Sequence, residues 1–256
     1  EAAGQPDAAA QYLAMAAERL PGEPSILRAA AQAAVESGSL GNARRLAAAA
    51  LALAPDDPAT LNQAAIVELA AGEAGKALEI AQRGLAIDPF NQSLIGWAAT
   101  AARRAGDPLF QELGDFDRVV GVYDIETPEG WPTLEAYLSD LAASLMRMHP
   151  YARHPFHQSL RHGSQTMQAL AGSTDPVIAA FFAAVDEPIC RHMAWLGTGA
   201  DPLRARNRGA YRIQNAWSVL LRPGGFHKDH FHPEGWLSSA FYVATPDAAL
   251  AGEGRD

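Results

Sequence analysis

Cysteine is almost absent from this sequence: Cys190 is the single one among 256 residues. One cysteine cannot close an internal disulfide, which excludes the disulfide-stabilised secreted scaffolds. Beside Ile189 in a helical stretch, Cys190 is expected to be buried. The sequence also lacks an apolar run of the roughly 20 residues that a membrane-spanning helix needs, and no signal segment is visible. We therefore expect a cytoplasmic protein with no membrane partner.

An excess of positive charge is lacking as well. The formal net charge is −9 at pH 7 and the sequence pI is about 5.3. A chain of this charge is not expected to bind nucleic acid or an anionic membrane surface. Its 48% hydrophobic and 19% charged residues are typical of a globular protein.

The first half of the chain lacks histidine, since all eight histidines lie after residue 148. Alanine and leucine dominate the first hundred residues instead. The amino-acid composition therefore changes between the two halves, which indicates a domain boundary. We predict a helical domain at residues 1–118, a linker at 119–132 and a second domain at 133–256.

The helical half repeats itself with a period of about 34 residues. Small residues and prolines recur in this register: Gly38, Gly72 and Gly106; Ala30, Ala64 and Ala98; Pro21, Pro55 and Pro89. Alanine lets two helices approach closely, glycine accepts the turn conformation between them, and proline stops the second helix. This pattern resembles the tetratricopeptide repeat (TPR), although a generic alanine-rich bundle stays an alternative. The resemblance implies helix pairs that turn near the three glycines, and a groove that binds a protein or peptide.

We place the repeats at residues 24–57 and 58–91, with a degenerate third at 92–118. A helix at residues 8–20 corresponds to the second half of an earlier repeat. Since each repeat buries its apolar face against its neighbours, that helix is expected to expose one. We therefore expect further sequence upstream.

Helices and then strands are expected after the linker. Thr133 is a predicted N-cap for a helix with one apolar face, and Asp175 with Pro176 opens another helix that Pro188 should interrupt. Alternating apolar residues then predict strands at residues 211–221 and 237–244. The apolar face of the first helix comprises Leu134, Tyr137, Leu138, Leu141, Leu145 and Met148. The order predicts an α+β domain in which helices back a β-sandwich or barrel.

A histidine-rich segment at residues 222–236 lies between the two predicted strands. His230 and His232 alternate along the chain and can therefore direct both imidazoles at one point. Neutral imidazole binds iron, zinc, copper or nickel. A solvated turn whose histidines only cap backbone groups is the alternative.

The segment from Pro223 and Gly224 through Phe226 to His230 resembles prolyl-hydroxylase-type 2-oxoglutarate oxygenases. Residues 154–166, 217–227 and 230–243 are similar to segments of iron(II)/2-oxoglutarate-dependent oxygenases that are fused to TPR arrays. The resemblance implies a TPR solenoid followed by a double-stranded β-helix (jelly-roll) domain with backing helices. It further implies Fe(II) as cofactor and 2-oxoglutarate as cosubstrate. His230 then stands at the first metal-ligand position and His227 near the cosubstrate.

Two departures from the family pattern matter. His232 stands where the family has a carboxylate ligand, so a pair of His227 and Asp229 stays open as an alternative to His230 and His232. A distal histidine ligand and a basic residue for 2-oxoglutarate are not found before Asp256, so we expect an incomplete barrel. Further candidates for the pocket are Gln158, Arg161, Gln165, Arg222 and Ser239.

Two functions are consistent with the sequence. The first is an oxygenase that hydroxylates a substrate, with the TPR array for protein or peptide interaction. The second is a TPR scaffold whose degenerate barrel binds a metal or ligand without turnover. The histidine at position 232 motivates the second.

Overall fold

The computed structural model describes residues 5–149, 159–167 and 169–246 of the chain. The chain divides into two compact units, Glu1–Val119 and Val120–Asp256. No helix among the described residues has both the length and the apolar character needed to cross a bilayer.

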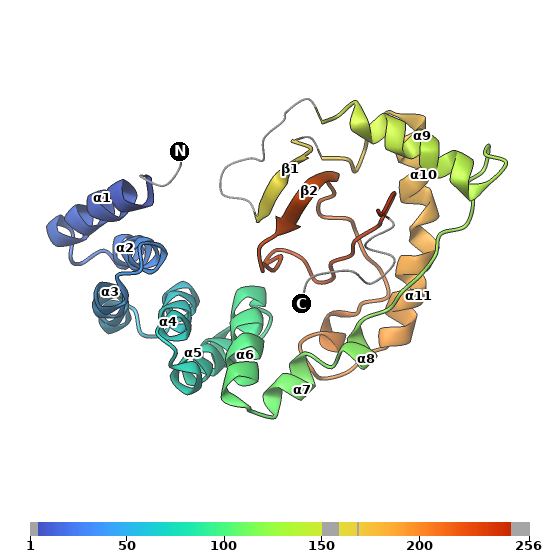
Figure 1. The fold of residues 1–256 in the computed structure, drawn as a ribbon. Helices are drawn as coiled ribbons and strands as arrows, with labels where there is room; N and C mark the ends of the chain where they lie inside the picture. Colours follow the sequence, from blue (N-terminus) through green and yellow to red (C-terminus); the bar gives the residue numbers. More distant parts are fainter. Residues whose placement is uncertain (1–4, 150–158, 168, 247–256) are drawn as a thin grey trace. The chain divides into compact units, whose positions relative to one another are not determined.

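The first unit is an array of helices, and its described residues contain no strand (Figure 1). The pair α2–α3 is followed one repeat period later by the pair α4–α5, with identical helix lengths. This observation confirms the predicted helical half and its register. The helices are α1 (Gln5–Arg19), α2 (Pro24–Glu36), α3 (Leu40–Leu53), α4 (Pro58–Ala70), α5 (Ala74–Ile87), α6 (Gln92–Ala105), α7 (Leu109–Leu113) and α8 (Phe116–Val119).

Glycines form the turns inside the helix pairs, as predicted. Gly38, Gly72 and Gly106 have φ of 76°, 84° and 69°, a left-handed conformation that a side chain would strain. Each follows the first helix of its pair within two residues. After Gly106 the regular pattern ends, because α7 is a short helix of little more than one turn.

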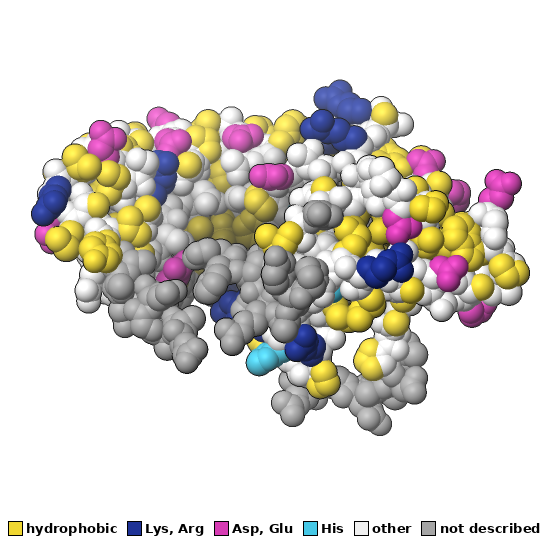
Figure 2. Space-filling view, turned by 90° about the horizontal axis from the view of Figure 1, so that it is seen from above, with side chains coloured by type: hydrophobic (Ala, Val, Ile, Leu, Met, Phe, Trp, Pro, Cys, Tyr) yellow, Lys and Arg dark blue, Asp and Glu magenta, His cyan; other side chains and the backbone are white. Residues whose placement is uncertain are grey.

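The core of this array consists largely of alanine and leucine. Ala30, Ala64 and Ala98 are at most 2% exposed, so the small side chains lie where neighbouring helices pack most closely. Apolar side chains also remain on the surface at the end of the array where α1 lies (Figure 2). Tyr12 on α1 is 74% exposed.

The second unit combines three longer helices with a two-stranded antiparallel sheet (Figure 1). The apolar face predicted for the first helix is confirmed: Tyr137 is fully buried, Leu141 is 2% exposed, and the other members pack against the same core. Thr133 caps this helix by accepting a hydrogen bond from the Ala136 amide at 3.2 Å. The elements are α9 (Leu134–Met146), β1 (Leu160–Gln165), α10 (Pro176–Ala184), α11 (Asp186–Leu196), a 3-10 turn at Arg204–Arg206 and β2 (Val219–His227).

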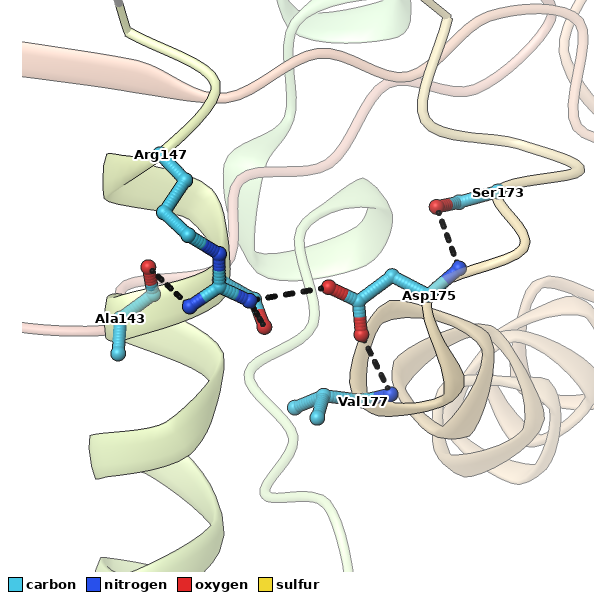
Figure 3. Close-up of polar contacts among 6 residues, drawn as sticks. Ala143, Arg147, Ser173, Asp175 and Val177 are labelled. Carbon is cyan, nitrogen blue, oxygen red and sulfur yellow. Dashed lines mark hydrogen bonds and ion pairs between the residues drawn. The ribbon is translucent and has the colours of Figure 1, made fainter.

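The predicted cap at Asp175 is also confirmed (Figure 3). Its Oδ1 accepts from the Val177 amide at 2.9 Å. Its Oδ2 lies 3.3 Å from Nη2 of Arg147, which also donates to Ser144. Burial works to raise the pKa of the Asp175 carboxyl, but the Ser144, backbone and Arg147 contacts outweigh it and lower the pKa below its ordinary 3.8.

Replacing Asp175 with asparagine should therefore reduce the acid sensitivity of this unit. A carboxyl with a depressed folded-state pKa stabilises the fold above its unfolded pKa, and the contribution is lost as the pH falls through the folded value. We expect the stability of the wild-type chain to decline below about pH 5 with a steeper slope than that of Asp175→Asn. Unfolding by urea at pH 3–7 measures the slope. Asparagine keeps the capping oxygen, so an equal slope would contradict the assignment.

Three sequence predictions about this unit need correction, whereas the break expected from Pro188 is confirmed. The helix is interrupted at Val185, between α10 and α11, and Pro188 lacks the amide that would bond the Ala184 carbonyl four residues earlier. Cys190 is exposed rather than buried. The predicted strand at residues 211–221 begins only at Val219 and continues to His227, so residues 222–227 belong to a strand and not to a loop.

The third correction concerns residues 237–244, which form no strand. Phe241 and Val243 instead pack their side chains, partly buried, against the core of α9 and α10. The alternating apolar residues therefore pack against the core, and among the described residues no neighbouring strand pairs with them. Among the described residues, the sheet of this unit consists of β1 and β2 alone.

Candidate functional site

The antiparallel pairing of β1 with β2 places His227 at the end of the ladder. Leu160 lies opposite His227, whereas Gly163 lies opposite Leu221, so the register shifts between Arg161 and Gly163. One residue of β1 thus faces a longer stretch of β2 that includes residues 222–225. Such a bulge bends a strand and redirects the side chains that follow it.

The glycines of the Pro-Gly-Gly run have a steric reason to be glycine. Gly224 has φ of 74°, which L side chains rarely adopt. A Cβ on Gly225 would lie 2.5 Å from the carbonyl oxygen of His162, and one on Gly163 would lie 2.6 Å from that of Leu220. His162, at the shift, itself has a φ of 51°. Close backbone approach at the bulge therefore requires the glycines.

Gly225→Ala should disrupt the pairing of β1 with β2. The added Cβ meets fixed backbone atoms, and such overpacking costs about 1–3 kcal/mol. Gly235→Ala is a matched control, because its nearest contact would be an ordinary 3.4 Å. Hydrogen exchange at the β1 amides should accelerate in Gly225→Ala and not in the control. Equal exchange in the two variants would contradict the steric account.

Three histidine rings gather directly after the bulge. The rings of His227 and His230 are stacked with centroids 5.4 Å apart, and those of His230 and His232 are perpendicular at 5.0 Å. Trp217, just before β2, lies 5.3 Å from the ring of His232. The structure thus brings the predicted pair His230 and His232 together, with His227 beside them.

Hydrogen bonds orient two of these rings. Nδ1 of His230 lies 2.8 Å from the carbonyl oxygen of Lys228. Since a carbonyl only accepts, Nδ1 donates this hydrogen bond, and in the neutral tautomer that it selects the lone pair lies on Nε2. Nδ1 of His227 lies 2.9 Å from Oγ of Ser159. The Lys228 amide donates to the carbonyl oxygen of Ser159 at 2.9 Å. Ser159, directly before β1, therefore holds the end of β2 in place: its side chain contacts His227 and its carbonyl accepts from Lys228.

The surroundings favour the neutral form of His227 and of His232. Burial lowers the pKa of His232, and the neighbouring His230 and His227 lower it further. Burial and His230 lower the pKa of His227 in the same way. Neutral imidazole is the form that binds a metal. Trp236 anchors the loop that carries the rings, because its Nε1 donates to the Leu203 carbonyl at 2.8 Å.

Among the described residues, two imidazoles of the predicted iron site lie close together. Two imidazoles bound side by side to one ion, at metal–nitrogen distances near 2.1 Å, have ring centroids about 4–5 Å apart. The 5.0 Å between His230 and His232 is close to that spacing. Within the described ranges, however, no three His, Cys, Asp or Glu side chains are grouped so as to hold an ion. That His230 and His232 act as ligands therefore stays a prediction.

The remaining described candidates lie on β1, in the bulge and in the segment after β2. Arg161 and Gln165 are half-buried on β1, where Nη1 of Arg161 donates to the Leu160 carbonyl at 2.7 Å. Arg222 is exposed in the bulge, and Asp229 and Ser239 are exposed outside the strands. Gln158 lies outside the described residues. None of these positions is tested as a pocket residue by the structure, so they stay predictions.

His149 was missed by the sequence reasoning. Its ring bridges two serines: Nδ1 lies 2.9 Å from Oγ of Ser164 and Nε2 lies 3.0 Å from Oγ of Ser218. It therefore connects the end of α9 to β1 and to the residue directly before β2. Burial lowers the pKa of His149. The partners lie 15 and 69 residues away along the chain, which no local motif reveals.

Comparison with known proteins gives one family match, in the part of the chain that holds the rings. The model of a family described as "Putative 2OG-Fe(II) oxygenase" matches residues 215–255. The match includes His227, His230 and His232. No curated protein matches the chain.

Among solved structures, one titled "MamA MSR-1 C2" matches with 14% sequence identity. It covers 45% of this chain and 69% of that chain, with a TM-score of 0.38. A likeness of that size does not establish a shared fold.

Proposed function

We propose that the second unit belongs to an iron(II)/2-oxoglutarate-dependent oxygenase of jelly-roll type. The gathering of the His227, His230 and His232 rings directly after β2 carries the proposal. This cluster lies inside the segment that the oxygenase family model matches. Fe(II) and 2-oxoglutarate are the cofactor and cosubstrate that such a domain implies.

In this proposal His230 and His232 hold the metal. The Lys228 carbonyl holds the His230 tautomer with Nε2 free, as a partner of a metal-ligating histidine does. His227 stands beside the pair for the cosubstrate, kept in place by Ser159. The Trp217 ring packs against His232, which restricts the orientation of the imidazole. When bound, iron and 2-oxoglutarate would supply the oxidation of a substrate C–H bond.

Succinate formation tests the proposal. The chain, and separately the longest natural protein that contains it, is loaded with iron(II) and supplied with 2-oxoglutarate and oxygen. We expect succinate from the wild type and its loss in His230→Ala. His192→Ala is a matched control, because that ring contacts Tyr123 and Trp195 rather than the cluster. Absence of turnover in both wild-type proteins despite bound iron would reject the oxygenase.

We further propose that the helical array binds a protein or peptide, which would present a substrate to the oxygenase. The repeated helix pairs α2–α3 and α4–α5 support this proposal, since stacked repeats form extended binding surfaces. Deleting residues 1–91 should then weaken substrate capture without abolishing 2-oxoglutarate turnover.

A scaffold without turnover is the second candidate. It is favoured by His232 at the position of the family's carboxylate ligand, and by the pair of imidazoles as the donor set within the described ranges. Metal binding in the absence of any 2-oxoglutarate consumption by the longer protein would select it.

A further inference from the structure

The ring of His149 holds the residue that follows Trp217 in the chain. Its Nε2 lies 3.0 Å from Oγ of Ser218, and its Nδ1 lies 2.9 Å from Oγ of Ser164. Both partners are hydroxyls, which donate or accept, so the neutral ring satisfies both of its nitrogens in either tautomer. Ser164 is 3% exposed, which shields its contact from water. His149 thus fixes the side chain of Ser218 relative to β1.

The backbone of Ser218 is held by a different residue. The Thr166 amide donates to the Ser218 carbonyl at 3.0 Å, and the Ser218 amide donates to Oγ1 of Thr166 at 3.0 Å. Two bonds to a single residue leave rotation about that residue, whereas a third bond at a separate point restricts it. The contact between His149 and the Ser218 hydroxyl is such a third point.

Trp217 transmits this restraint to the histidine cluster. Adjacent side chains of an extended chain point to opposite faces, so holding Ser218 on one face sets the direction of the Trp217 ring on the other. The indole is 37% exposed and therefore depends on its own backbone for much of its orientation. Its ring lies 5.3 Å from the ring of His232, centroid to centroid, at an interplanar angle of 54°.

We propose that His149 is a positioning residue that acts on His232 through Trp217. It holds Ser218, and Ser218 directs the tryptophan ring against the imidazole. The inference rests on the proposed metal site, in which His232 is one of the two ligands.

Two amide variants separate the contacts of the two ring nitrogens. The amide of asparagine stands where a histidine has Nδ1, and that of glutamine reaches as far as Nε2; both donate and accept. His149→Gln therefore keeps the contact with Ser218, whereas His149→Asn keeps the contact with Ser164. Replacing each serine with alanine removes the same contact from the other side. Ser218→Ala should behave as His149→Asn does, and Ser164→Ala as His149→Gln does.

The ring protons of His232 report the contact by NMR in the metal-free chain, because the ring current of a neighbouring indole shifts their resonances. His232→Ala assigns these resonances, and Trp217→Leu gives their position without the indole. We expect His149→Asn to move them toward the Trp217→Leu position and His149→Gln to leave them where the wild type has them.

Iron(II) affinity measures the consequence for the site. His149→Asn should lower it by about threefold to tenfold, at or below the low end of the cost of losing a direct support of a ligand, and His149→Gln should not. Equal displacement of the His232 resonances in the two variants, wild-type resonances in His149→Asn, or an undiminished iron affinity of that variant overturns the inference. A wild-type chain that binds no iron rejects the proposed metal site instead, and the resonances still decide whether His149 acts on His232.

Discussion

His230→Ala and His232→Ala are each expected to lower the iron(II) affinity of the chain at least tenfold. Removal of a ligand should exceed the 10–100-fold cost that is typical of changes to the residues behind the ligands. Each variant keeps only one of the two imidazoles, whose ring centroids lie 5.0 Å apart in the structure. Anaerobic competition with a chelating dye measures the affinity.

Asp229→Ala is the matched control, since Asp229 lies between His227 and His230 in sequence and is exposed. It should change the affinity little. A large loss in Asp229→Ala, together with a small loss in His230→Ala, would favour the alternative pair of His227 and Asp229. Unchanged affinity in all of these variants would place the iron elsewhere or nowhere in the chain.

The helices were predictable because their signals are local. Thr133 and Asp175 each satisfy an amide within three residues, and the glycine turns of the array recur at a fixed spacing. Periodicity and capping act over a few residues, so a sequence pattern reports them directly. Pro188 acts in the same local way, because the break between α10 and α11 at Val185 lies within the turn that precedes it.

The sheet was less predictable because strand pairing is set by distant residues. Alternation at residues 211–218 and 237–244 matched a strand pattern, yet the ladder forms only where β1 lies opposite β2. The bulge opposite His162 depends on Gly163 and Gly225 approaching backbone far along the chain. A period of two indicates a half-buried extended segment, whether or not a partner strand is present.

The candidate site divides in the same way. His227, His230 and His232 lie within six residues, so their gathering could be predicted from the sequence. Their supports could not: Ser159 reaches His227 from 68 residues away, and Trp236 anchors the loop to Leu203. His149 likewise joins segments that are separated along the chain. The identity of the candidate ligands is a local property of the sequence, whereas the orientation of their rings depends on the fold.

Leu46→Ala is expected to destabilise the helical array by about 3 kcal/mol, within the range measured for buried leucines that leave a cavity. Leu46 is 1% exposed and lies in a core rich in alanine. Because alanine side chains are short, the surrounding helices already pack closely and have little freedom to move into the space that the substitution leaves. Tyr12→Ala, at the same register position on α1, should change stability by no more than about 0.5 kcal/mol, as exposed positions do.

Native-state hydrogen exchange at the α4 amides measures both variants in the array alone, which matters because two units need not unfold together. Ile80→Ala, at 6% exposure, should resemble Leu46→Ala. If Tyr12→Ala proved as costly as Leu46→Ala, the face of α1 would already be covered in the free chain. A small effect at Tyr12 with large effects at Leu46 and Ile80 means that burial by a neighbouring helix, and not the position within the repeat, determines how much each side chain stabilises the array.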